Sequence, residues 1–190
     1  MNERECKVFY KALDSSKVQE ELARFKKYVD GLAFDEENLG LLKDILSEAK
    51  GIFEEKYEVM LIGAGKSLMQ ALSVLGEGKF KVLVAPDKLE DVAKLKKTYR
   101  EFSDIELGIH ITKPTVSLAP FARHEVKFVV MPPTLVRGRL ISEAKARKID
   151  VVAYPVNDVT TYVRLLELGV SAVVTTDPAI GREARKLLKM

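Results

Sequence analysis

DVVAYPVNDVTTYVRLLELGVSAVVTTD, residues 150–177, contains two short apolar runs separated by a stretch with a different period. The runs Asp150–Tyr154 and Ser171–Thr175 are rich in valine, which favours strands. Between them, Thr160–Leu168 spaces its apolar side chains three and four residues apart, as in a helix that buries one face. Two strands joined by one helix predict a βαβ unit with parallel strands.

The same alternation runs back to the N-terminus. Further strands are predicted at Lys7–Leu13, Asp30–Phe34, Glu58–Ile62, Phe80–Ala85, Ile105–Ile111 and Lys127–Met131. Further helices are predicted at Lys17–Tyr28, Glu37–Lys56, Ser67–Leu75, Leu89–Phe102, Leu135–Arg147 and Ile180–Lys189, with a short or missing helix in the stretch Val116–Arg123. Eight βα units predict one α/β domain over residues 1–190, a small (β/α)8 TIM barrel with short loops, since ~250 residues is typical of that fold. An open doubly wound sheet shows the same alternation and is the alternative fold.

The composition is that of a folded protein in water. Hydrophobic residues make up 47% of the chain and charged residues 31%. No apolar run reaches the ~18 residues of a membrane span and the first residues are charged, so we expect a cytoplasmic protein without a membrane partner. Cys6 is the one cysteine, which excludes a disulfide within the chain. Abundant lysine and glutamate, with few amides, indicate a thermophilic source.

The candidate site is the set of residues that follow the predicted strands, because ligands of such barrels bind at the C-terminal ends of the strands. These residues are Lys11, Asp14, Asp35, the loop 63–66, Asp87, Lys88, His110, Lys113, Arg137, Arg139, Asn157, Asp158, Thr176 and Asp177. Several cations on one rim predict a small phosphorylated ligand. The same residue types at helix starts are also ordinary caps, and the pattern does not separate the two roles.

One loop and the two histidines carry more specific signals. The loop Gly63-Ala64-Gly65-Lys66-Ser67 lies between a strand and a helix, and Gly65, Lys66 and Ser67 are candidate phosphate ligands. A nucleotide-hydrolase loop also needs glycine at position 60, which is methionine here. His110 alternates with two isoleucines and is a candidate general acid or base in the barrel mouth, whereas His124 is expected in a loop.

The last third of the chain resembles a known family. Tyr154, Val156-Asn157, Leu168-Gly169-Val170 and Thr175-Thr176-Asp177-Pro178 resemble the C-terminal motifs of glycerophosphodiester phosphodiesterases, chiefly over residues 150–185. The resemblance implies a barrel, a phosphodiester substrate, carboxylates that hold a divalent cation (Mg2+ or Ca2+), and two histidines as general acid and base.

The N-terminal motifs of that family are largely missing. Where the family has His-Arg-Gly, this chain has Tyr10-Lys11-Ala12, and where it has Glu-x-Asp, the segment Ala33-Phe34-Asp35 keeps the aspartate alone. The second family histidine has no counterpart. Asp35 is therefore the one candidate metal ligand, if the family site is retained, and Asp35 and Lys11 are the candidate catalytic residues. Without the two histidines, the family mechanism does not carry over.

Two functions remain open. The first is a divergent phosphodiesterase-like barrel that binds a phosphate-containing ligand through the loop 65–67, Asn157 and Thr176, with phosphoric diester hydrolysis in doubt. The second is a non-catalytic regulator or an RNA-binding barrel, as in the protein subunit of archaeal ribonuclease P. The net charge of +3 is spread along the chain, which gives no dedicated RNA footprint. Exposed apolar helix faces would allow a homodimer.

Overall fold

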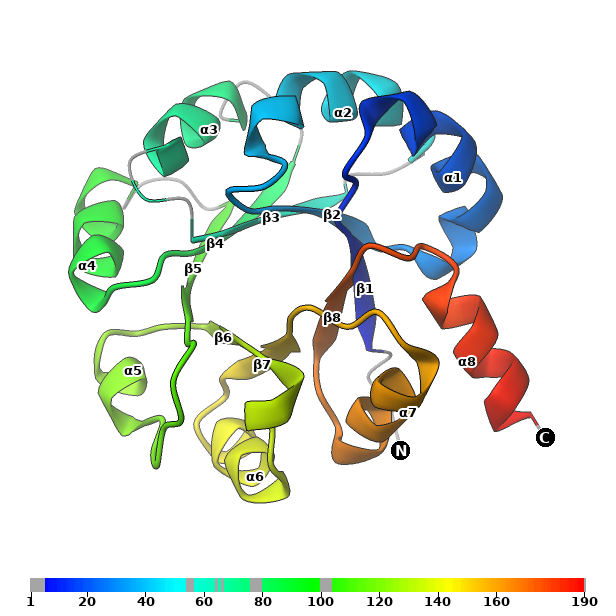
Figure 1. The fold of residues 1–190 in the computed structure, drawn as a ribbon. Coiled ribbons are helices and arrows are strands. Elements are labelled where there is room, and N and C mark those ends of the chain that lie inside the picture. The colour runs from blue at the N-terminus through cyan, green and yellow to red at the C-terminus, as the bar shows by residue number, and fades with distance from the viewer. Residues whose placement is uncertain are drawn as a thin grey trace.

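The protein is a closed barrel of parallel strands, seen end-on in the computed structural model of Figure 1. The structure describes residues 6–53, 57–63, 65, 67–75, 80–99 and 104–189. The described strands are β1 (Lys7–Tyr10), β2 (Gly31–Phe34), β3 (Glu58–Ile62), β4 (Lys81–Ala85), β5 (Ile105–His110), β6 (Phe128–Met131), β7 (Asp150–Ala153) and β8 (Ala172–Thr175). Each strand pairs with the next along the chain, and β8 pairs with β1. The (β/α)8 prediction is thus confirmed, and the open sheet is wrong.

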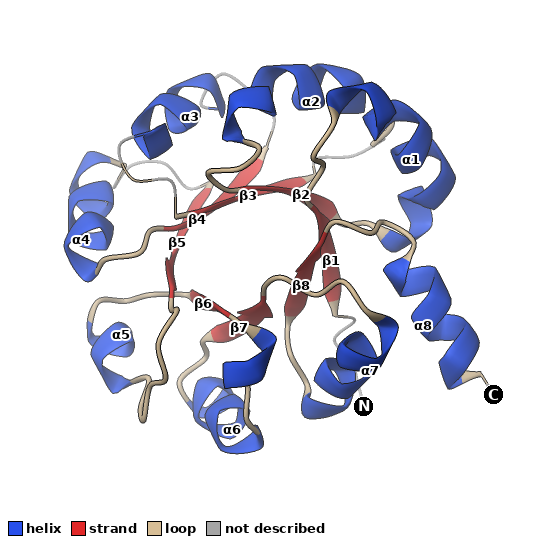
Figure 2. Ribbon diagram, in the orientation of Figure 1, coloured by secondary structure: helices blue, strands red, loops and turns tan. Residues whose placement is uncertain are grey.

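The helices form a ring outside the strands (Figure 2). They are α1 (Val18–Phe25), α2 (Leu42–Ala49), α3 (Ser67–Leu75), α4 (Leu89–Thr98), α5 (Ala119–Arg123), α6 (Gly138–Ala146), α7 (Val159–Leu168) and α8 (Ile180–Leu188), with 3-10 turns at Ser15–Lys17, Lys26–Tyr28, Leu39–Leu41 and Pro133–Leu135. The short α5 agrees with the weak signal after β5. None of the described helices combines the length and the apolar character of a membrane span.

Among the predicted elements, the second helix differs most from the structure. Glu37–Lys56 was expected to be helical from its first residue, but α2 begins at Leu42 after a 3-10 turn. The side chain of Asp35 accepts the N–H of Glu37 at 2.9 Å, a local turn that competes with the helix. At the other end, Lys50 leaves the helical conformation and Gly51 has φ +85°. Residues 54–56 lie outside the described part of the chain.

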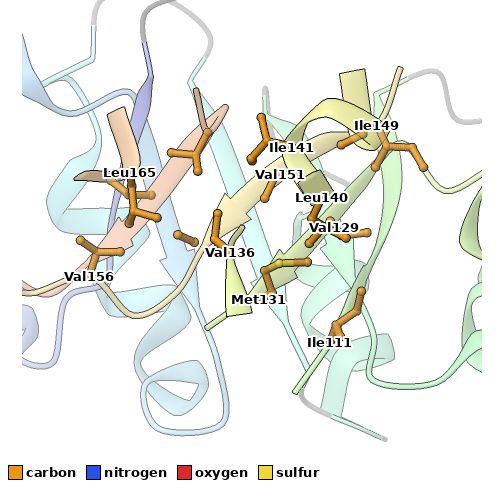
Figure 3. Packing of buried hydrophobic residues seen from close by; sticks show 14 of the residues in the cluster. Ile111, Val129, Met131, Val136, Leu140, Ile141, Ile149, Val151, Val156 and Leu165 are labelled. Carbon is orange, nitrogen blue, oxygen red and sulfur yellow. The ribbon is translucent and has the colours of Figure 1, made fainter. Parts of the chain in front are cut away.

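Alternation along the strands divides the core into two layers. Inward-facing side chains, including Phe9, Met60, Leu83, Phe128 and Val174, fill the barrel. Outward-facing strand side chains such as Val129, Met131 and Val151 pack against side chains of the helices and connecting segments. Figure 3 shows these three with Ile111, Val136, Leu140, Ile141, Ile149, Val156 and Leu165. The barrel is therefore a packed core and not a pore, as is usual for this fold.

Two glycines make room for the aromatic side chains inside the barrel. Phe9 is paired with Gly31, and Phe128 with Gly108. A Cβ on Gly108 would lie 2.6 Å from the Phe128 ring, and one on Gly31 would lie 2.8 Å from the Phe9 ring. Both distances are too short for real atoms, so each ring lies directly over the glycine of the neighbouring strand.

The N-terminal end of the barrel carries a ladder of charges. Glu58 Oε1 lies 2.9 Å from Lys7 Nζ and 3.5 Å from Lys81 Nζ, and Lys81 Nζ lies 3.3 Å from Glu106 Oε2. These four side chains come from β1, β3, β4 and β5. These four side chains therefore neutralise one another at this end of the barrel.

Three successive helices end in the same way. The N–H of Val126, Ile149 and Val170 reaches back to a carbonyl five residues earlier, at the ends of α5, α6 and α7. This bond requires a left-handed residue just before it. Gly169 supplies it after α7, with φ +88°, whereas Glu125 and Lys148 adopt it without being glycine, each with φ 57°.

Candidate functional site

A pocket of about 340 Å³ opens at the C-terminal ends of β1, β7 and β8. It is lined by Lys11, Leu13, Glu37, Tyr154, Pro155, Asn157, Val174, Thr175 and Thr176. Three residues singled out from the sequence, Lys11, Asn157 and Thr176, therefore share one pocket. Asp35 lies next to it through its contact with Lys11.

Lys11 supplies the buried cation of the pocket. Its side chain is 8% exposed, and its Nζ lies 2.6 Å from Asp35 Oδ2 and 3.0 Å from Glu37 Oε2. Burial by itself would lower the pKa of Lys11, but the hydrogen bonds and charges of the two carboxylates outweigh it and raise the pKa above its ordinary value. Lys11 is thus a fixed ammonium group, suited to holding an anion and unsuited to acting as a nucleophile.

Asp35 is fully engaged by its neighbours. Its Oδ2 accepts hydrogen bonds from Lys11 and from the Tyr154 hydroxyl, and its Oδ1 accepts the N–H of Glu37. Burial opposes the charged form, but the bonds from Lys11 and Tyr154 prevail and lower the pKa of Asp35. Burial and the same carboxylate raise the pKa of Tyr154 above its ordinary value. Asp35 therefore stays a carboxylate, and Tyr154 stays a neutral donor.

Asn38 fixes the backbone around Asp35 through hydrogen bonds and was not among the site residues predicted from the sequence. Its side chain is fully buried. Its Oδ1 accepts the N–H of Asp35 at 2.9 Å, and its Nδ2 donates to the carbonyls of Ala12 at 2.9 Å and Ala33 at 3.1 Å. Asn38 thereby joins the chain after β1 to β2. An asparagine within an expected helix gave no sign of this role.

Asn157 organises the other wall of the pocket. Its Oδ1 accepts the N–H of Thr176 at 2.9 Å and the hydroxyls of Thr176 at 3.0 Å and Thr175 at 3.3 Å. With its oxygen engaged by these donors, the amide offers a ligand its N–H groups. Asn157 therefore fixes the end of β8 and contributes donors that suit an anion.

The described residues of the glycine loop do not line this pocket. Gly65 is exposed with φ +47°, and Ser67 is the exposed first residue of α3. Neither residue lines the pocket. Gly63 lies instead beside Asp87, whose Oδ1 would be 3.4 Å from a Cβ on that glycine. Lys66, the third candidate of this loop, lies outside the described residues.

The other side of the barrel mouth holds a histidine and a carboxylate. His110 Nδ1 lies 2.8 Å from Asp87 Oδ1, and the histidine ring packs edge-on against Tyr154, with 5.7 Å between the ring centroids. Lys11 Nζ lies 5.8 Å from the centroid of the same Tyr154 ring. The Tyr154 ring is therefore a common neighbour of the cation and the histidine.

The divalent cation that the family resemblance implies does not fit these residues. Both Asp35 oxygens already accept hydrogen bonds, and the Lys11 ammonium lies where a metal ion bound to Oδ2 would have to approach. Among the described residues, no group of three or more histidine, cysteine, aspartate or glutamate side chains is placed to hold a metal ion. We therefore assign no step to a metal.

Comparison with solved structures identifies the fold. A glycerophosphodiester phosphodiesterase from Parabacteroides distasonis matches with a TM-score of 0.63 at 10% identity, over 97% of this chain and 98% of that one. A phosphodiesterase from Oleispira antarctica, in complex with the product sn-glycerol-3-phosphate, matches with a TM-score of 0.59 at 14% identity, over 80% of this chain. The match spans only 60% of that longer chain.

The fold is also shared beyond the phosphodiesterases. The citrate synthase SbnG matches with a TM-score of 0.57 at 12% identity, over 99% of this chain and 92% of that one. No protein family model matches the chain, and no curated protein matches it. The predicted resemblance to glycerophosphodiester phosphodiesterases is therefore confirmed at the level of the fold.

Proposed function

We propose that this chain is a divergent relative of the glycerophosphodiester phosphodiesterases that binds a phosphate-containing ligand in the pocket between β1, β7 and β8. The observation that carries the proposal is the Lys11–Glu37 ion pair at 3.0 Å inside that pocket. Glu37 is 64% exposed and Lys11 only 8%. A carboxylate from the surface thus reaches in to a cation that is fixed in the barrel, and an external anion can replace it.

The donors around Lys11 suit a phosphate group. The Asn157 amide lines the same pocket as the Lys11 ammonium, whereas the Thr176 hydroxyl donates its proton to Asn157 Oδ1 and holds that amide in place. A phosphate offers several acceptor oxygens, and charge-assisted hydrogen bonds to them are stronger than neutral ones. The Oleispira antarctica phosphodiesterase, whose fold is similar, is in complex with sn-glycerol-3-phosphate. That compound is therefore the first ligand to test.

The affinity is expected to be modest. Asp35 already neutralises much of the Lys11 charge, and the ligand must displace Glu37 before it reaches the ammonium. We expect a Kd between about 0.1 and 1 mM, equivalent to about 4 to 5.5 kcal/mol.

Calorimetric titration with sn-glycerol 3-phosphate, and with inorganic phosphate in parallel, tests the proposal. Thr176→Val removes the hydroxyl that holds Asn157 Oδ1, without removing a charge, and should weaken binding, whereas Lys11→Gln should abolish it. Lys94→Gln, on the exposed face of α4, is the matched control and should bind normally. Equal binding by the Lys11→Gln variant and the control, or no binding by the native chain, would refute the assignment.

The regulator or RNA-binding alternative finds no comparable site among the described residues. A second groove, of about 500 Å³, contains Lys81, Lys96, Lys127 and Lys148. Lys81 is paired with Glu58 and Glu106, and Lys96 with Glu125. Pairing reduces the number of counterions that Lys81 and Lys96 would release on binding RNA, whereas Lys127 and Lys148 also line this groove.

A further inference from the structure

His110 is not among the residues that line the phosphate pocket. His110 is the last residue of β5, and its neighbour Ile109 packs outward under the helices. Because side chains alternate along a strand, His110 points into the barrel mouth. Its side chain is 15% exposed, so it is mostly enclosed but still open to a ligand.

The backbone and Asp87 fix the orientation of the ring. The N–H of His110 donates to the carbonyl of Pro86 at 2.9 Å, which extends the pairing of β5 with β4. One residue further on, Asp87 Oδ1 lies 2.8 Å from His110 Nδ1. A carboxylate at this distance accepts the proton of Nδ1, and the neutral ring then has Nε2 as its acceptor. A histidine oriented in this way can act as a general base through Nε2.

The histidine and the cation belong to one mouth, since both lie against the ring of Tyr154. We propose that His110, oriented by Asp87, is the general base of a phosphodiester hydrolysis in which Lys11 binds the phosphate. The inference rests on the proposed phosphate pocket. It places the base on β5, whereas the motif with the first family histidine corresponds to Tyr10-Lys11-Ala12 at the end of β1.

The step is the attack of water on phosphorus. His110 Nε2 takes a proton from the water as its oxygen bonds to phosphorus. The bond from phosphorus to the leaving oxygen breaks, and that oxygen departs with the electron pair. For bis(4-nitrophenyl) phosphate the products are 4-nitrophenyl phosphate and 4-nitrophenolate, which needs no proton to leave. The imidazolium then returns its proton to solvent, and Lys11 balances charge on the phosphate throughout.

Release of 4-nitrophenolate from bis(4-nitrophenyl) phosphate, in a buffer with EDTA, tests the inference. We expect His110→Ala to lower kcat by about 100-fold or more, the usual contribution of a general base, and to leave KM unchanged. Asp87→Asn should lower kcat less. His124→Ala, which changes the exposed histidine at the groove on the other end of the barrel, is the matched control and should keep full activity.

Chemical rescue separates catalysis from structure. Imidazole added to His110→Ala should restore part of kcat in proportion to its concentration, which a merely structural role would not produce. No turnover by the native chain, or equal turnover by His110→Ala and His124→Ala, would overturn the inference. Binding of sn-glycerol 3-phosphate without turnover would overturn the role of His110 and leave the phosphate pocket standing, whereas turnover without that binding would refute the pocket.

Discussion

Glu37→Gln tests how the phosphate pocket is occupied when no ligand is bound. In the native chain the Glu37 carboxylate lies 3.0 Å from Lys11 Nζ, in the position proposed for a phosphate oxygen. Glutamine keeps the size and shape of the side chain and removes its charge. The substitution should therefore make the pocket bind phosphate more tightly, although it deletes an ion pair of the native structure.

The size of the expected change in Kd follows from the exposure of Glu37. Its side chain is 64% exposed, so its pair with Lys11 contributes between about 0.2 and 1 kcal/mol, the range of surface pairs. The ligand no longer has to break that pair, and repulsion between the carboxylate and phosphate, screened by water, also disappears. Together these effects amount to about 1 kcal/mol, which is roughly a fivefold decrease in Kd.

The assay is calorimetric titration of native, Glu37→Gln and Glu36→Gln proteins with inorganic phosphate at one ionic strength. Glu36 is the adjacent exposed carboxylate and does not line the pocket, so Glu36→Gln controls for the change in net charge. Equal Kd values for the two variants would show that the change in Kd comes from net charge alone. A weaker Kd for Glu37→Gln would refute the reasoning, because Glu37 would then assist the ligand.

Four further predictions follow from described contacts. Asn38→Ala leaves the carbonyls of Ala12 and Ala33 without their side-chain donor and should lower the free energy of unfolding in urea by about 2 to 3 kcal/mol. The pKa of Asp35 is lowered in the folded state, so its carboxylate stabilises the fold fully above the unfolded pKa of about 4, and this stabilisation is lost as the pH falls below that value. The free energy of unfolding in urea should therefore change less between pH 5 and pH 3 in Asp35→Asn than in the native chain. Lys148→Gly relieves a positive φ and should raise the melting temperature, with a gain of about 0.5 to 1 kcal/mol, whereas Gly169→Ala should lower it. EDTA should leave the Kd for phosphate unchanged, since in the proposed pocket Lys11 and not a metal neutralises the ligand. A loss of binding that Mg2+ restores would contradict this proposal.

The βα pattern predicted eight units, and the count of eight favoured a closed barrel. Valine-rich runs and amphipathic stretches have different periods, but that difference is shared by an open sheet, which only the strand pairing excludes. Element ends were harder to predict because side chains decide them locally. The late start of α2 depends on the turn at Asp35, which competes with the helix at short range.

The site was predicted in part, because some of its residues follow strands and others depend on loop conformation. Lys11, Asn157 and Thr176 follow strands β1, β7 and β8, and closure of the barrel brings those strand ends together. Glu37 and Asn38 were missed, since their roles depend on a loop conformation that has no periodic signal. The pairing of His110 with Asp87 joins residues 23 positions apart and appears only once β4 and β5 are placed side by side. A homodimer, a cytoplasmic location and a thermophilic source remain predictions.

The rings of Phe9 and Phe128, each seated over a glycine, are among the apolar side chains that fill the barrel below the mouth. A ligand at this end cannot descend along the barrel axis, so we expect the proposed pocket to recognise its phosphate group while the rest of the molecule extends into solvent. Selectivity of this kind depends little on the size of the attached group. A free glycerol phosphate and a phosphate carried on a long chain should therefore compete for the mouth on nearly equal terms.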